Sequence, residues 1–106
     1  DRETNEIFEF GPFHLDVVDA RLSRDGAPVS LPPKVFDLLV YLVSRAGRLV
    51  EKEELLRALW PDSFVEEANL TVNVATLRRA LGTREDGQNW IETVPKRGYR
   101  FSPDVK

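Results

Sequence analysis

The sequence contains no cysteine, no methionine and a single histidine, His14, so several kinds of chemistry have no residues to support them. Without cysteine the chain cannot form disulfides, thiolate metal ligands or thiol nucleophiles. One histidine cannot form the histidine cluster that zinc requires. The chain also lacks an apolar run close to the ~20 residues that cross a bilayer. What it has is 106 residues, 42% of them hydrophobic, which suits one globular domain.

Residue patterns typical of enzymes are also missing. Glu53 and Glu54 are consecutive on a predicted helix and point in different directions, and His14 occupies an outward position of a predicted strand. No glycine loop suited to phosphate and no metal-ligand spacing is present. We therefore expect no enzyme, no cofactor and no metal. Because the sequence opens on Asp1, we expect it to be a piece of a longer protein.

The net charge is −3, which by itself argues against a nucleic-acid partner. The charges are unevenly placed, however. Residues 1–66 contain 8 Lys and Arg against 13 Asp and Glu, whereas residues 67–106 contain 7 against 5. Local charge decides docking more than the total does, so the second part can still present a basic surface.

The first part, about residues 7–31, is predicted to form three or four short antiparallel strands. Apolar and polar residues alternate from Phe13 to Val17, as in a strand with one buried face. Asp25 and Gly26 are typical of a tight hairpin turn, because both favour a positive φ. The predicted strands cover residues 6–10, 13–17, 20–24 and 28–31.

Three helices are predicted next, over about residues 33–46, 51–60 and 68–81. Pro33 is tolerated in a first helical turn, and Gly47, Pro61 and Gly82 supply stops. The apolar residues of the third helix lie within ~40° of one another on a helical wheel, which predicts its core face. Residues 48–50 are predicted to be a short extended link between the first two helices.

The outward face of the third helix is predicted to contact DNA. No acidic residue occurs from Leu70 to Leu81, although the chain is acidic overall. Small, amide and hydroxyl side chains with two arginines suit a helix in a major groove, where arginine contacts guanine or phosphate and asparagine contacts adenine. Val72 could pack on thymine methyl groups. An ordinary solvated face with one exposed valine is an open alternative.

A hairpin over about residues 90–102 is predicted next, with Pro95 to Gly98 at its tip and Gly98 free to adopt a positive φ. Its cations Lys96, Arg97 and Arg100 can meet a phosphate backbone or a minor groove. A charged turn that protects an edge strand is the alternative. Tyr99, Phe101, Trp60 and Trp90 are predicted mainly to pack in the core.

The succession of two helices, a loop and a basic hairpin predicts a winged helix-turn-helix, an α+β fold. The sequence resembles the OmpR/PhoB-type winged-helix DNA-binding domain from Ile7 to Ser102. The most specific segments are Leu77-Arg78-Arg79-Ala80-Leu81 and Gly98-Tyr99-Arg100-Phe101. The run from Thr93 to Phe101 is similar to the CadC/ToxR-like branch of that family.

This resemblance implies a four-stranded N-terminal sheet, three helices and a C-terminal hairpin wing. It implies the effector domain of a bacterial transcription regulator, acting in the cytoplasm, with the third helix in the major groove of double-stranded DNA. Thr71, Val72, Ala75 and Thr76 would face bases, while Arg78 and Thr93 would lie near the DNA backbone. Better-known members carry arginines at the positions of Ala75 and Thr76.

Together, the candidate DNA-binding residues are Asn69, Thr71, Val72, Asn73, Ala75, Thr76, Arg78, Arg79, Thr93, Lys96, Arg97, Tyr99 and Arg100. By resemblance, the loop between the second and third helices is expected to contact RNA polymerase through Asp62, Ser63, Phe64, Val65 and Glu66. Tandem self-association on DNA is a further expectation, and membrane contact would involve only other parts of the parent protein. A winged-helix module that binds proteins without DNA is the competing hypothesis.

Overall fold

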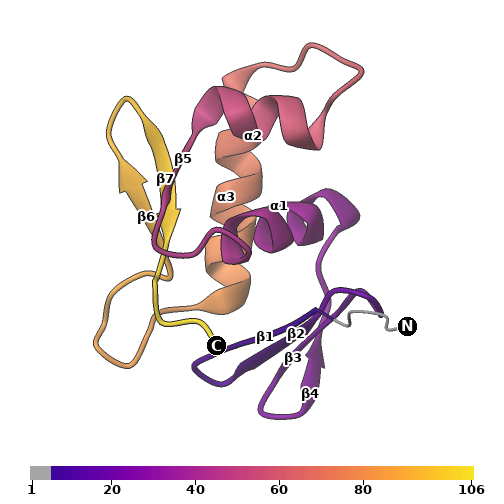
Figure 1. The fold of residues 1–106 in the computed structure, drawn as a ribbon, viewed down its shortest axis with the longest axis vertical. Coiled ribbons are helices and arrows are strands. Elements are labelled where there is room, and N and C mark those ends of the chain that lie inside the picture. The colour runs from indigo at the N-terminus through magenta and orange to yellow at the C-terminus, as the bar shows by residue number, and fades with distance from the viewer. Residues whose placement is uncertain (1–5) are drawn as a thin grey trace.

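The computed structural model describes residues 6–106, and it divides the chain into an N-terminal sheet, three helices and a second sheet (Figure 1). The N-terminal sheet has the antiparallel order β1-β2-β3-β4. Its strands are β1 (Ile7–Phe10), β2 (Phe13–Asp16), β3 (Arg21–Arg24) and β4 (Ala27–Val29). Asp25 and Gly26 have φ values of 50° and 85°, so the predicted hairpin turn between β3 and β4 is confirmed.

The helices are α1 (Pro33–Val43), α2 (Lys52–Leu59) and α3 (Glu67–Leu81). The predicted end of α1 at residue 46 is wrong. Arg45 and Ala46 donate their backbone N–H groups three residues back, to Leu42 and Val43, and so form turns in place of a further α-helical turn. Gly47 then donates to the carbonyl of Phe101, which directs the chain toward the C-terminal hairpin.

The second sheet contains the C-terminal hairpin, β6 (Ile91–Val94) and β7 (Gly98–Phe101), which is the predicted wing. It also contains β5 (Leu49–Glu51), in the order β5-β7-β6. The sequence predicts only an extended link at β5, because three residues are too few to show a strand pattern. Pairing of β5 with β7 turns the wing into a three-stranded sheet joined to the start of α2.

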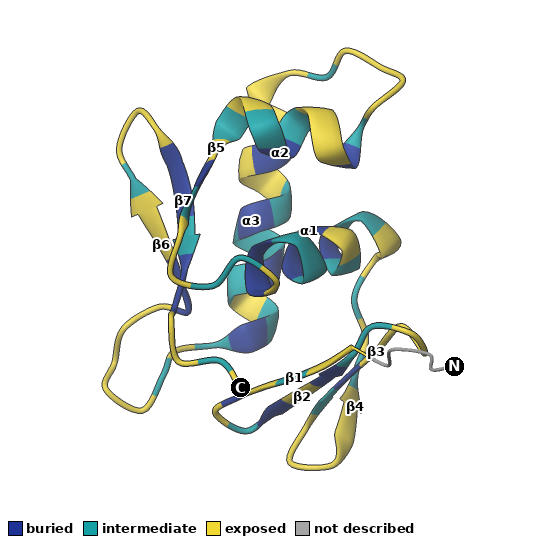
Figure 2. Ribbon diagram, in the orientation of Figure 1, coloured by how far each residue is buried: buried dark blue, intermediate teal, exposed yellow. Residues whose placement is uncertain are grey.

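The core lies where the two sheets and the helices meet. Phe10, Phe13, Trp90 and Phe101 form an aromatic cluster with ring centroids 5.2–6.3 Å apart. Buried leucine and valine side chains from all three helices and from β2, β3 and β5 surround it. Figure 2 shows buried and exposed bands alternating along α3, and a mostly buried β7 beside a β6 that is exposed at its centre. In residues 6–106, no helix has the length and apolarity that a membrane span requires.

Candidate nucleic-acid interface

α3 presents a polar face to solvent because its apolar residues all lie on the opposite side. Leu70, Val74, Leu77 and Leu81 are buried against the rest of the molecule, which confirms the predicted core face. On the outward side, Arg79 is exposed and Val72 retains 63% of its accessible surface. An exposed β-branched side chain in this position can make apolar contact with a ligand.

Three polar side chains of α3 donate hydrogen bonds to the helix itself. The amide of Asn73 donates to the carbonyl of Asn69 at 2.7 Å, and the hydroxyls of Thr71 and Thr76 donate to carbonyls four residues earlier. Each of these bonds uses a donor and leaves the side-chain oxygen available to accept. Ala75 and Thr76 are half-buried, so the side chains in the middle of this face project little into solvent.

The wing lies alongside α3 and is attached to the start of α2. The backbone N–H of Lys52 donates to the carbonyl of Arg97 at 3.1 Å. A Cβ atom at Gly98 would collide with the carbonyl oxygen of Val50, so the β5–β7 contact requires glycine at this position. The positive φ at the wing tip belongs to Lys96, at 66°, and Gly98 does not use the positive φ that it is free to adopt.

Arg78 joins the C-terminal half of α3 to the base of the wing. Its Nε and Nη2 atoms donate to the carbonyl oxygen of Ile91 at 3.2 and 2.7 Å, and Nη2 also donates to the Thr93 hydroxyl at 2.7 Å. Its guanidinium carbon lies 5.9 Å from the centroid of the Tyr99 ring. α3 and the wing are therefore in direct contact, because the Arg78 side chain reaches the backbone of a residue 13 positions along the chain and the side chain of another 15 positions along it.

Three cations of this region, Lys52, Arg97 and Arg100, have a carboxylate partner. Arg97 pairs with Glu51 at 3.4 Å, and Lys52 pairs with Glu67 at 2.8 Å. The hydrogen bond to Glu67 raises the pKa of the Lys52 ammonium above its usual value. Arg79 has no carboxylate within 4.0 Å among residues 6–106, and neither has Lys96. These two are the cations most available to a phosphate.

The structure does not bring all the candidate residues onto one surface. Tyr99 is 7% exposed and packs in the core, so its ring supports the wing from inside. Side chains alternate along a strand, which places Arg100 on the opposite face of β7 from Tyr99 and Phe101. There Arg100 pairs with Glu92 at 3.3 Å. Asn69 and Asn73 lie on the flank of α3 that faces away from Arg78 and the wing.

Sequence reasoning also missed residues of this surface. The pairing of β5 with β7 brings three charged residues near the wing tip, namely Glu51, Lys52 and Glu67. No local sequence pattern predicts that pairing. The acidic partners were likewise not predicted. Glu51 is far in sequence from Arg97, and Glu92 contacts Arg100 across the β6–β7 strand pair.

The loop between α2 and α3 forms a separate apolar surface. Phe64 is fully exposed, and Leu56, Trp60 and Val65 line an adjoining hollow of about 520 Å³. In Figure 1 this loop lies at the end of the molecule farthest from the N-terminal sheet. Lys34 anchors the end of α2 by donating to the carbonyl of Leu59 at 2.6 Å. Asp62, Ser63 and Glu66 complete the exposed part of the loop.

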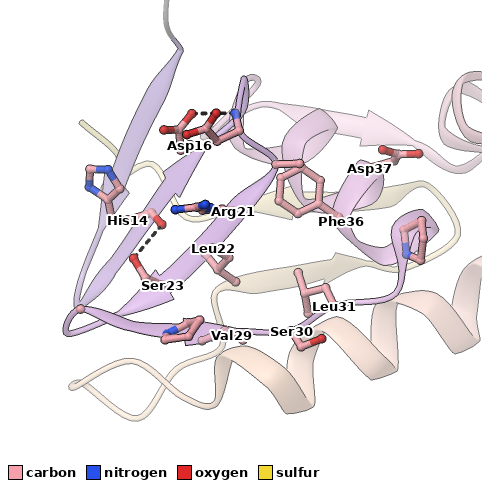
Figure 3. A pocket seen from close by; sticks show the side chains of 15 residues that line it. His14, Asp16, Arg21, Leu22, Ser23, Val29, Ser30, Leu31, Phe36 and Asp37 are labelled. Atoms are coloured by element: carbon pink, nitrogen blue, oxygen red, sulfur yellow. Dashed lines mark hydrogen bonds between the residues drawn. The ribbon is translucent and has the colours of Figure 1, made fainter.

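A second hollow, of about 840 Å³, lies between the N-terminal sheet and the start of α1 (Figure 3). His14 and Ser23 both line it, but the Ser23 hydroxyl donates to the backbone carbonyl of His14 at 3.5 Å and not to its imidazole. The imidazole lies 3.4 Å from the Glu9 carboxylate. The two side chains are therefore not arranged as a nucleophile and its base. His14 is exposed, as predicted.

The model of one protein family matches residues 26–101, from the β3–β4 turn to the end of the wing. That family is described as the C-terminal domain of transcriptional regulatory proteins. The chain belongs to this family. The OmpR/PhoB-type resemblance and the winged-helix fold predicted from the sequence are thereby confirmed, as is the function class of a DNA-binding effector domain of a transcription regulator. The family is one of regulatory domains and not of enzymes.

Individual relatives fit this assignment. The transcriptional regulator HilA of Salmonella typhi is 38% identical over 102 residues, which cover 96% of this chain and 18% of HilA. The transcriptional activator CadC of Escherichia coli is 36% identical over 86 residues, covering 80% of this chain and 17% of CadC. The chain thus spans under a fifth of the length of these relatives.

Solved structures of DNA-binding domains share the fold. The DNA-binding domain of E. coli CadC superposes with a TM-score of 0.83 at 30% identity, covering 97% of this chain and 98% of that one. The DNA-binding domain of Klebsiella pneumoniae RstA, in complex with the RstA box, superposes with a TM-score of 0.78 at 26% identity. It covers 92% of this chain and 98% of the RstA chain.

Proposed function

We propose that this domain binds double-stranded DNA in a sequence-specific manner, with the outward face of α3 in the major groove and the wing tip on the adjacent backbone or minor groove. The observation that carries the proposal is the contact of Arg78 with Ile91 and Thr93, which holds α3 and the wing side by side. A rigid pair of elements can grip a groove and its flanking phosphates together.

The residues divide into two roles. Val72, Ala75 and Thr76, with Thr71 beside them, provide small apolar and hydroxyl groups that fit base edges and thymine methyl groups. Arg79, Lys96 and Arg97 provide charge for phosphates, which sets affinity and orientation without reading sequence. Because Ala75 and Thr76 carry no guanidinium, sequence preference rests on shape and methyl contacts more than on arginine–guanine pairs.

The test begins with a duplex that the wild-type domain enriches from a randomised library, compared with a scrambled duplex of the same length. We expect binding to weaken steeply as salt rises, because phosphate contacts release counterions. Thr76→Val should change which sequence is enriched. Arg97→Ala should weaken binding to both duplexes alike, whereas Arg21→Ala, which removes the same charge from the distant β3, should not.

Binding without any salt dependence would contradict the proposal. The competing hypothesis, a winged-helix module that binds only proteins, makes a different prediction for amide chemical shifts. Added duplex DNA should perturb α3 and the wing tip if DNA is the ligand. If only the N-terminal sheet and the loop around Phe64 respond, and only to a protein, the competing hypothesis is favoured.

We further propose that the loop of residues 61–67 contacts RNA polymerase. The full exposure of Phe64 beside an apolar hollow supports a protein partner at this surface. Phe64→Ser should reduce transcription activation in a reconstituted system and leave duplex binding unchanged; equal activation by both forms would contradict this role.

We also propose that copies bind adjacent half-sites in tandem, and that the domain acts in the cytoplasm, where the chromosome is accessible.

A further inference from the structure

We infer that Arg78 is a positioning residue that fixes the wing against α3, and not a phosphate ligand. The inference rests on the proposed DNA-binding function and specifies how its two elements are held in register. It starts from the three hydrogen bonds that the guanidinium donates to β6, at 2.7, 2.7 and 3.2 Å. No other side chain of α3 is recorded donating to the wing among residues 6–106.

These bonds occupy donors that a bidentate contact with phosphate through Nη2 would need. An arginine has one N–H on Nε and two on each Nη atom. In Arg78, Nε donates to the Ile91 carbonyl, and Nη2 donates to both that carbonyl and the Thr93 hydroxyl. A bidentate grip on phosphate uses Nη2 together with a neighbouring nitrogen. Nη1 is the only guanidinium nitrogen that these bonds leave unengaged. Arg78 could therefore form a bidentate contact only by releasing β6.

The acceptor on β6 explains why release would be unfavourable. Ile91 is fully buried, and a buried carbonyl without a hydrogen-bond partner is destabilising. The Arg78 guanidinium also lies near the ring of the buried Tyr99. The side chain is therefore held from two directions and is half-buried, unlike its exposed neighbour Arg79.

The other strand of the wing, β7, is held by β5. The two strands pair from Arg100 to Gly98, and Gly98 lies against the backbone of Val50 and Glu51. β6 is the outer strand of this sheet and pairs only with β7, so without Arg78 its edge would have no contact to α3 through a side-chain hydrogen bond. Arg78 on β6 and β5 on β7 thus hold both strands of the hairpin and set the direction of the wing tip relative to the outward face of α3.

This arrangement predicts that the charge of Arg78 and the geometry of its hydrogen bonds affect DNA binding in different ways. Non-specific binding depends on the number of cations, whereas specific binding needs α3 and the wing to reach their contacts at the same time. Arg78→Lys preserves the charge but cannot donate to both Ile91 and Thr93 with a planar fork. We expect its affinity for the selected duplex to fall about tenfold, the effect of one lost hydrogen bond to a charged group.

In the same variant, affinity for the scrambled duplex should stay within about twofold of wild type, because no charge is lost. For the same reason, the slope of log affinity against log salt should stay within about 0.3 of the wild-type slope. Arg21→Lys serves as the matched control and should leave both affinities unchanged. If Arg78→Lys binds the selected duplex as well as wild type, or weakens both duplexes equally, the inference is overturned.

A double-mutant cycle distinguishes a shared bond from two independent contacts. Thr93→Val removes the hydroxyl acceptor at nearly constant shape and should weaken selected-duplex binding severalfold. Because both changes break the same bond, Arg78→Lys with Thr93→Val should be little weaker than Arg78→Lys alone. Losses that multiply would mean that Thr93 and Arg78 act separately, which would refute the shared positioning role.

A measurement on the free protein keeps this inference separate from the proposed function. In Arg78→Lys, amide exchange in β6 should accelerate about tenfold while exchange in α1 stays unchanged, because only the base of the wing is released. Unchanged exchange in β6 would overturn the inference without reference to DNA. Failure of the wild-type domain to bind any duplex would instead refute the proposed function.

Discussion

Two cations of the wing should respond very differently to alanine substitution, although they lie four residues apart. Lys96 is at the exposed tip with no carboxylate within 4.0 Å among residues 6–106, whereas Arg100 lies on the sheet face opposite Tyr99 and pairs with Glu92. We predict that Lys96→Ala weakens binding to every duplex and that Arg100→Ala changes it little. Both variants lose one positive charge, so each is the control for the other.

The magnitude follows from counterion release. One phosphate contact contributes about 0.9 to the slope of log affinity against log salt, which at about 0.1 M salt corresponds to roughly an eightfold change in affinity. Lys96→Ala should show both effects. Arg100 lies on the far side of the sheet, where screening over a Debye length of about 10 Å leaves a few tenths of a kcal/mol, less than about twofold.

The assay is a titration of the selected and scrambled duplexes by fluorescence anisotropy at several salt concentrations. Thermal unfolding of both variants checks that the fold is retained. Equal weakening by the two substitutions would refute the assignment of the two wing faces. An unchanged salt slope for Lys96→Ala would refute the placement of the tip on a phosphate.

Three further predictions concern the scaffold and the loop. Gly98→Ala should destabilise the fold by about 2 kcal/mol or more, because the new Cβ meets the Val50 carbonyl, and the midpoint of thermal unfolding should fall accordingly. Tyr41→Phe removes a 2.5 Å hydrogen bond to Glu54 and should lower the free energy of unfolding by about 1 kcal/mol, as denaturant titration would show. That bond raises the pKa of Tyr41 above 10.0, so the stability that the bond contributes should be present at neutral pH and decline as pH rises from about 10 through the folded pKa. A pH series in which the stability difference between wild type and Tyr41→Phe shows no such decline would contradict this assignment. Phe64→Ser should leave stability within about 0.5 kcal/mol of wild type, since the ring is fully exposed.

The elements of the fold could be predicted where a local pattern specifies them. The α3 core stripe from Leu70 to Leu81 repeats at helical spacing, and the Asp25-Gly26 turn requires residues that accept positive φ. β5 could not be predicted, because its three residues become a strand only through pairing with β7. The same tertiary pairing explains why Gly98 is needed for close packing and not for its own φ.

The candidate site was predictable as a list of residues but not as a surface. Helical periodicity placed Val72 and Arg79 on the outward face of α3, and both are exposed. Strand alternation separates Arg100 from the interior face, and the predicted core packing of Tyr99 is confirmed by its 7% exposure, but the pairing of Arg100 with Glu92 appears only in the structure. The partners of Arg78 lie 13 and 15 residues away on another element, so only the structure shows that this arginine is engaged.

The pairing of charges suggests why a net acidic domain can still be selective for DNA. Lys52 and Arg97 each contact a carboxylate of the same surface, so a phosphate must compete with Glu67 or Glu51 for them. Exposed ion pairs contribute at most about 1 kcal/mol, so this competition is mild, but it lowers affinity for all sequences equally. Correctly placed contacts from α3 are added only on the right sequence. A surface with few unpaired cations and a fixed angle between helix and wing therefore has weak non-specific binding, and a larger share of its binding free energy depends on sequence.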